Sequence, residues 1–200
     1  MDVTFDVPAA FTSIPPGMTH EETLAYTNAQ AVEHPSHTAP DPAAVERTQA
    51  VSQVLSRMGT LYAGAAFGLI SEEPSAATLL VTAQSFPYGA DAQVAAEGTL
   101  QALVAERGPN WTGGVQPLPC GQPAAVVVGG RVYELPGSER PVPFAELQAF
   151  IPVPENPTLP EQALLAVTFT TPALRHWEQY MPAVTQLLRT LTFAEKHPVS

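Results

Sequence analysis

The spacing of apolar residues changes several times along the chain, between a helical period and a strand period. Four segments carry helix start signals or apolar residues three or four positions apart, and they are 19–33, 41–58, 91–107 and 171–191. Other segments alternate every second position, as strands do, and they are 3–14, 61–70, 76–86, 124–128, 131–135, 144–153 and 162–170. The mixture predicts an α+β domain.

Residues typical of helix N-termini indicate where the helices begin. Thr19 followed by Glu22 has the spacing of a capping box, in which each residue satisfies a free N–H group of the other. Asp91 can cap the third helix, and Asp41-Pro42 and Thr171-Pro172 each pair a capping side chain with a proline of preset φ. The stripes expected to face the core are Ala44, Thr48, Val51, Leu55 and Met58; Ala96, Leu100, Leu103 and Val104; and Leu174, Trp177, Met181, Val184, Leu187, Leu188 and Leu191.

Glycines are expected to mark turns and close contacts. The strand at 61–70 and the next strand form a predicted hairpin around a loop at 71–75. Gly64 and Gly68 lie inside the first strand, which predicts a helix packed closely over them. Gly129-Gly130 can supply the positive φ values of a two-residue turn, and so predicts a second hairpin.

Composition favours one domain and disfavours several classes of partner. A chain of 200 residues can bury a sizeable core without staples, and its single cysteine excludes a disulfide framework. We expect one domain at 1–193 and a short tail at 194–200. Eight basic residues against 19 acidic ones give a net charge of −11, which disfavours nucleic acid and membrane surfaces. The first residues lack the pattern of a signal peptide, so a cytoplasmic protein is expected.

The reactive side chains form no recognisable catalytic or metal-binding motif. His34, His37 and Asp41 could be written as a metal site, but a proline separates the histidines and no fourth ligand is near. His176 has no nucleophile tied to it by a motif and is expected at the surface or its boundary. Cys120 is expected to be a partly buried thiol in a turn. We predict no catalytic residue, cofactor or metal.

Acidic residues are unevenly spread. The first 100 residues hold eleven acidic and two basic side chains, whereas the second 100 hold eight and six. Such an asymmetry is either a solvated surface that maintains solubility or an acidic face that meets a basic partner. The candidate partner contacts are Glu21, Glu22, Glu33, Glu46, Glu72 and Glu73.

The two ends of the chain resemble a known superfamily. The residues that carry the resemblance are the run Leu164 to Pro172, then Trp177, Tyr180, Pro182, Leu187-Leu188 and Thr190 to Phe193, with Phe5-Asp6-Val7-Pro8 and Phe11 near the start. This segment order is similar to that of the PsbP-like α/β/α sandwich superfamily, which includes actinobacterial LpqN-like proteins and relatives of secretion-effector chaperones. The resemblance implies a central, mostly antiparallel sheet with helices on both faces, and a scaffold that binds other proteins. It carries no catalytic residues.

Three functional hypotheses follow. The first is a non-enzymatic cytoplasmic module, an adaptor or chaperone-like partner of a larger, basic or secreted protein. The second is a small-molecule-binding protein or enzyme with a pocket between sheet and helix, using Arg131, Tyr133 and His176. The third is a self-associating subunit that pairs through a free sheet edge or the Trp177 helix.

Overall fold

The computed structural model describes residues 2–33, 42–135, 139–154 and 161–194. Its strands are β1 (Asp2–Thr4), β2 (Thr12–Ser13), β3 (Thr60–Ile70), β4 (Glu73–Ser85), β5 (Thr112–Pro117), β6 (Pro123–Tyr133), β7 (Val142–Pro152), β8 (Ala163–Thr171) and β9 (Thr192–Ala194). Its helices are α1 (His20–Glu33), α2 (Pro42–Arg57), α3 (Ala92–Arg107), the 3₁₀ turn η1 (Leu174–His176) and α4 (Trp177–Thr190). The predicted tail, apart from Ala194, lies outside the described residues.

A single large sheet organises the molecule. Seven strands pair in the order β2-β3-β4-β8-β7-β6-β5, and every recorded pair is antiparallel. The short strands β1 and β9 form a separate pair that joins the two ends of the described chain. The predicted α+β fold is confirmed, and β5 is a strand that the hydrophobic pattern did not predict.

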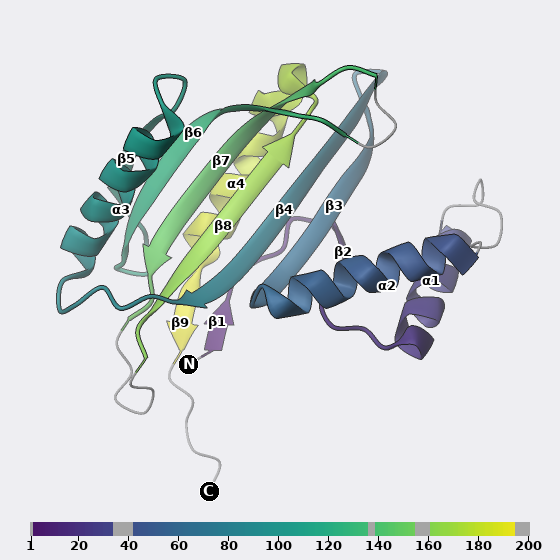
Figure 1. The fold of residues 1–200 in the computed structure, drawn as a ribbon, viewed down its shortest axis with the longest axis horizontal. Coiled ribbons are helices and arrows are strands. Elements are labelled where there is room, and N and C mark those ends of the chain that lie inside the picture. The colour runs from purple at the N-terminus through teal and green to yellow at the C-terminus, as the bar shows by residue number, and fades with distance from the viewer. Residues whose placement is uncertain (1, 34–41, 136–138, 155–160, 195–200) are drawn as a thin grey trace, which may run out of the picture.

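Helices α3 and α4 lie on opposite faces of this sheet (Figure 1). Val127 of β6 lies on the α3 face, because its side chain and that of Leu100 both stand close to Gly113. Its neighbours Val126 and Val128 pack instead with the core beneath α4. The expected helices on both faces are therefore present, and α3 packs mainly against β5, β6 and β7.

The main core lies between α4 and the sheet. Val184, Leu187 and Leu191 are almost fully buried there, as predicted. Leu188 is also buried, and Trp177 and Met181 pack partly buried against the same core. The predicted stripe is wrong at Leu174, which is 46% exposed, and it misses Tyr180, which is buried. The cause is local: the chain makes the 3₁₀ turn η1 before α4 begins, so residues before 177 do not continue the α-helical period.

The α1–α2 pair lies beside the edge of the sheet (Figure 1). The capping box that starts α1 is confirmed, because the Thr19 N–H donates to a Glu22 carboxylate oxygen at 2.8 Å and the Glu22 N–H to the Thr19 hydroxyl at 3.3 Å. The predicted stripe of α2 is partly wrong, since Val51 and Met58 are exposed while Ser52 is fully buried. Ser52 is buried because its hydroxyl binds the loop before α1, accepting from the Met18 N–H at 2.7 Å.

The predicted β3–β4 hairpin is present, but its loop and the surroundings of its glycines differ from the prediction. The β3–β4 hairpin turns through Ser71 and Glu72 alone, at φ 50° and 67°, and not through a five-residue loop. At Gly64 no helix packs over the strand; a Cβ there would stand 2.2 Å from the Tyr62 hydroxyl, and one at Gly68 would meet nothing within 4 Å. The aromatic ring in the same strand is thus what requires a glycine at position 64.

Gly129 and Gly130 do not form the predicted turn. They lie inside the continuous strand β6, which pairs with β7 on both sides of them. A Cβ at Gly129 would stand 2.3 Å from Cδ2 of the Trp111 indole. The glycine is there because an aromatic ring occupies the space above the strand, which a hydrophobic pattern read along one segment cannot show.

Candidate functional site

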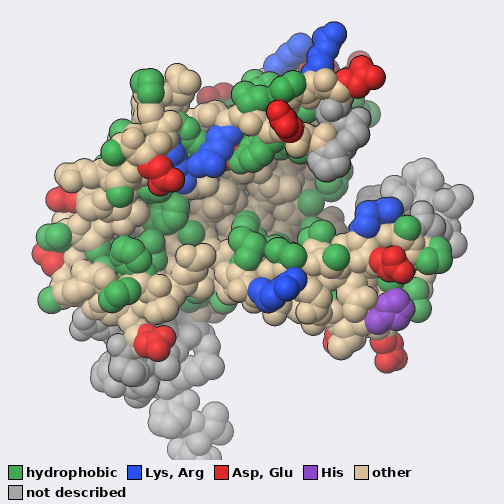
Figure 2. Space-filling view, in the orientation of Figure 1, with side chains coloured by type: hydrophobic (Ala, Val, Ile, Leu, Met, Phe, Trp, Pro, Cys, Tyr) green, Lys and Arg blue, Asp and Glu red, His purple; other side chains and the backbone are tan. Residues whose placement is uncertain are grey.

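One half of the sheet is uncovered on the α3 side, and we call it the open face. It consists of the outward side chains of β3, β4 and β8, namely Phe67, Leu69, Ala76, Thr78, Leu80, Thr168 and Thr170. Figure 2 shows this side of the molecule hollowed between α3 and the far end of the β6–β7 hairpin on one flank and α2 on the other. We call this concave region the hollow.

Burial along β8 shows that only one face of the sheet is packed at this point. Leu165, Val167 and Phe169 point toward α4 and are 0% exposed. The intervening Thr168 and Thr170 point to the open face and are only partly buried. Such alternation is typical of an antiparallel sheet with one solvated face.

Two large apolar side chains stand exposed on the open face. Phe67 is 81% exposed and Leu69 is 70% exposed, although both lie in the long strand β3. Their neighbours in sequence point to the other side, where Ala66 belongs to the core. Because β3 is paired along its length with β4, the two side chains are displayed by a fixed backbone.

A polar group at the α3 end of the hollow, which we call the arginine cluster, combines opposite charges around an indole. Its members are Arg107, Trp111, Arg131, Tyr133, Glu146 and Gln148. The guanidinium carbon of Arg107 lies 4.3 Å from the centre of the Trp111 ring, and that of Arg131 lies 5.5 Å from it. Both distances are within cation–π range.

Glu146 is the buried anion of the arginine cluster. It is 1% exposed, yet it lies on a strand in the middle of the sheet. The Tyr133 hydroxyl donates to its Oε1, and Arg131 Nε stands 3.6 Å from its Oε2. The buried carboxylate therefore has a partner at each oxygen, as a buried charge requires.

The environment shifts two pKa values in the arginine cluster. Burial lowers the pKa of Arg107, and the nearby Arg131 guanidinium lowers it further, against the attraction of Glu146. Burial and the hydrogen bond to Glu146 raise the pKa of Tyr133. Tyr133 is thus held as a neutral hydrogen-bond donor, and no proton-transfer role is needed to explain it.

The sequence suggested part of the arginine cluster but not its centre. Arg131 and Tyr133 are two of the three dispersed residues that the sequence offers for a ligand pocket, and the structure brings both to Glu146. Trp111 could not be assigned from sequence, and it is 5% exposed here. Arg107 was expected only as the last turn of a helix, whose start is fixed by the Asp91 cap on the Gln93 N–H at 2.8 Å.

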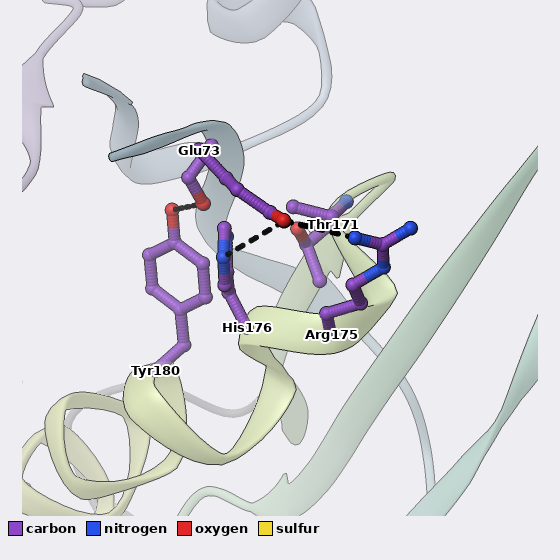
Figure 3. Close-up of polar contacts among 7 residues, drawn as sticks. Glu73, Thr171, Arg175, His176 and Tyr180 are labelled. Atoms are coloured by element: carbon purple, nitrogen blue, oxygen red, sulfur yellow. Dashed lines mark hydrogen bonds and ion pairs between the residues drawn. The ribbon is translucent and has the colours of Figure 1, made fainter. Parts of the chain in front are cut away.

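His176, the third candidate in that hypothesis, lies at the start of α4 (Figure 3). That helix is on the face of the sheet opposite to α3 (Figure 1). Its prediction as a surface or boundary residue is wrong, because it is 6% exposed. Its Nε2 stands 3.9 Å from the Glu73 carboxylate, which also accepts from Arg175 at 3.0 Å. These contacts, with a 2.7 Å hydrogen bond between Ser75 and Tyr180, join the β3–β4 hairpin to the start of α4.

The predicted acidic contacts lie in two regions. Glu21, Glu22 and Glu46 are exposed on the α1–α2 pair, whereas Glu72 and Glu73 lie at the tip of the β3–β4 hairpin. Glu33 is the last residue of α1, and its side chain lies outside the description. Glu22 is already engaged in its capping box and Glu73 with Arg175. Their role in binding stays a prediction.

The remaining candidates can be placed briefly. Cys120 is a partly buried free thiol in the turn before β6, as predicted. His34, His37 and Asp41 lie outside the described residues. Within the described part of the chain, no group of three or more His, Cys, Asp or Glu side chains could hold a metal ion. None of the helices described here is both long enough and apolar enough to span a bilayer.

Comparison with known proteins gives a distant likeness of fold. No family model matches the chain, and no curated protein matches its sequence. The fold is similar to a crystal structure of LpqN, described as involved in cell envelope biogenesis of Mycobacterium tuberculosis, at 12% identity and a TM-score of 0.48. That match covers 96% of this chain and 83% of the LpqN chain. It is too distant to assign a family or a function, so the PsbP-like resemblance stays a prediction.

Proposed function

We propose that the protein is a non-enzymatic binding module, an adaptor or chaperone-like partner, that receives a segment of another protein on its open face. The observation that carries the proposal is the exposure of Phe67 and Leu69, side by side on one face of a paired strand. Large apolar side chains that a rigid sheet presents to solvent are typical of interaction surfaces. Burial of the two on binding would supply the hydrophobic part of the affinity.

The surroundings of these side chains suit a peptide. Thr78 and Thr170 lie beside the apolar pair, on the next strands of the same face, and their hydroxyls share a hydrogen bond of 2.6 Å. Each hydroxyl oxygen keeps a lone pair that can accept from an N–H group of a bound backbone. Glu72, at the hairpin turn three residues after Leu69, is proposed as a contact for a basic group of the partner. The other predicted acidic contacts remain part of this proposal.

Site-specific photo-crosslinking tests the proposal. A photoreactive residue is placed at Phe67, and a matched control is placed at Val94, which is 61% exposed on α3. We expect a defined adduct with another protein from position 67 and none from position 94. Adducts from both positions, or from neither, would contradict the proposal.

Substitution gives a second, independent measurement. Phe67→Ser with Leu69→Ser should leave the free energy of unfolding within about 0.5 kcal/mol of the parent, because both side chains are solvated. The doubly substituted protein should lose affinity for the crosslinked partner, while Val94→Ser should retain it. A change in light-scattering mass on substitution would instead identify a second copy of this chain as the occupant.

A small-molecule ligand is the second candidate function. It is favoured by the meeting of Arg131 and Tyr133 at Glu146 beside the hollow. A thermal-shift screen of anionic metabolites tests it, with Arg131→Gln as the control that should remove any shift. A protein adduct at position 67 without a thermal shift would favour the first function.

A further inference from the structure

The arginine cluster contains a buried donor with no acceptor. Among the described residues, Arg107 Nη1 is shielded from solvent and has no hydrogen-bond partner. The Nη2 of the same side chain donates to the Gln148 side-chain oxygen. Guanidinium groups in water are fully hydrogen-bonded, so a buried N–H without an acceptor is unfavourable unless something else supplies one.

The charges of the cluster are not all paired. Arg107 and Arg131 are two cations, and among the described residues the ion pair of the cluster joins Arg131 to Glu146. Glu146 is occupied by Tyr133 at one oxygen and by Arg131 at the other. Arg107 is attracted by Glu146 and by the exposed Glu106, but it forms no ion pair with either of them. Its charge is partly buried, where electrostatic interactions are stronger than in water.

The arginine cluster is open to the hollow through Arg131. The Arg131 side chain is 44% exposed. Figure 2 shows basic side chains at the wall of the hollow, where the end of α3 meets β6. In a chain with a net charge of −11, two of the eight basic residues lie over a single indole ring. The Trp111 ring holds both guanidinium groups near one another despite their mutual repulsion.

We propose that Arg107 and Arg131 bind a carboxylate group carried by the segment that docks on the open face. This inference rests on the proposed function and identifies the chemistry of the partner. A carboxylate has a negative charge, which would give Arg107 an ion-pair partner, and two oxygens that suit the fork of N–H groups on a guanidinium. A phosphate dianion fits less well, because its second charge would face the buried Glu146.

The test uses small carboxylates as probes and NMR as the readout. The side-chain N–H signals of Arg107 and the indole N–H of Trp111 are followed during titration with acetate, and chloride at equal ionic strength is the control. We expect saturable shifts at these signals with acetate and none at Trp177, which lies on the α4 side. Shifts that do not saturate, or that chloride reproduces, would overturn the proposal.

Variants separate a binding role from a structural one. Arg107→Gln should weaken acetate binding by about tenfold, the loss expected for one charge-assisted hydrogen bond. Arg107→Lys keeps the charge without the fork and should give an intermediate loss. Arg175→Gln, at an exposed arginine bound to Glu73, should leave acetate binding unchanged. Equal binding by the parent and a folded Arg107→Gln variant would overturn the assignment.

Two further probes identify the source of the carboxylate. N-acetylglycine presents a chain-terminal carboxylate, and the α-amide of N-acetylaspartate presents a side-chain carboxylate. Tighter binding of either than of acetate supports the proposal and names the source, while preference for inorganic phosphate contradicts it. Acetate binding without an adduct at position 67 would retain the carboxylate site and reject the open face as a protein-docking surface. An adduct at position 67 without acetate binding would retain the docking surface and reject the carboxylate site.

Discussion

The indole ring of Trp111 lies directly on Gly129, where a Cβ atom would stand 2.3 Å from the ring. The contact joins the segment after α3 to the middle of β6. It also sets the height at which Arg107 and Arg131 can lie over the ring, 4.3 Å and 5.5 Å from its centre. Because Gly129 has no Cβ atom, the indole ring can lie against the strand, and the position of the ring in turn determines where the two guanidinium groups lie.

Gly129→Ala should displace Trp111 and reduce the free energy of unfolding by about 1–3 kcal/mol, as overpacking does. Chemical denaturation measures the loss, and near-ultraviolet circular dichroism reports the changed environment of the indole. The control is Gly98→Ala in α3, where a Cβ meets nothing within 4 Å. That change should stabilise the protein by about 0.5–1 kcal/mol, because alanine favours a helix. A Gly129→Ala protein as stable as the parent would show that the ring can move without cost.

Tyr133 should make stability depend on pH in the alkaline range. Its pKa is raised in the folded state above the ordinary value of 10.0, so the folded protein holds the phenolic proton more tightly than the unfolded chain does. The stabilisation is complete below pH 10 and is lost as pH rises through the folded-state pKa. Tyr62, whose pKa burial also raises, acts in the same direction.

Urea unfolding of the parent and of Tyr133→Phe, measured from about pH 8 to about pH 11, checks this dependence. The parent should lose stability with rising pH more steeply than the variant, which keeps only the contribution of Tyr62. Tyr62→Phe provides the matched control with the complementary loss. Parallel curves for the parent and Tyr133→Phe would contradict the raised pKa.

The corrected packing of the last helix predicts unequal costs for two leucines in the same predicted stripe. Leu187 is 0% exposed against the sheet, and Leu187→Ala should cost about 2–5 kcal/mol as a core truncation. Leu174 is 46% exposed, so Leu174→Ala should change stability by no more than about 0.5 kcal/mol. Thermal or chemical unfolding distinguishes the two variants, and similar losses of stability would show that Leu174 faces the core as the sequence pattern predicts.

Sequence reasoning succeeded where the signal is local. The capping residues Thr19 and Asp91 start their helices as predicted, because a cap is formed by groups two or three residues apart. Alternation also predicts β3, β4, β7 and β8, since a residue on one side of a strand is buried when its neighbour is not, but it divides the long strand β6 into two. The Gly129-Gly130 pair shows what a local signal leaves open. Such a pair suits either a turn or a close contact, and only the distant Trp111 ring decides between them.

The candidate site was only partly accessible to sequence reasoning for the same reason. Arg131 and Tyr133 lie two residues apart in one strand and so share a face, which alternation alone indicates. Glu146 joins them through the register of β6 with β7, and Arg107 arrives at the end of a helix packed over those strands. His176 was separated from them by the sheet itself.

The helices, most of the strands and the α+β class could be predicted from the sequence, because they depend on periodicity and on contacts within a few residues. Three outcomes could not be predicted and required the folded structure: which side of each element is buried, where the open face lies and which charges meet. Those outcomes depend on strand order and helix placement, which bring together residues distant in sequence such as Arg107 and Gln148. The hydrophobic pattern of one segment does not show which distant residue will contact that segment in the folded protein.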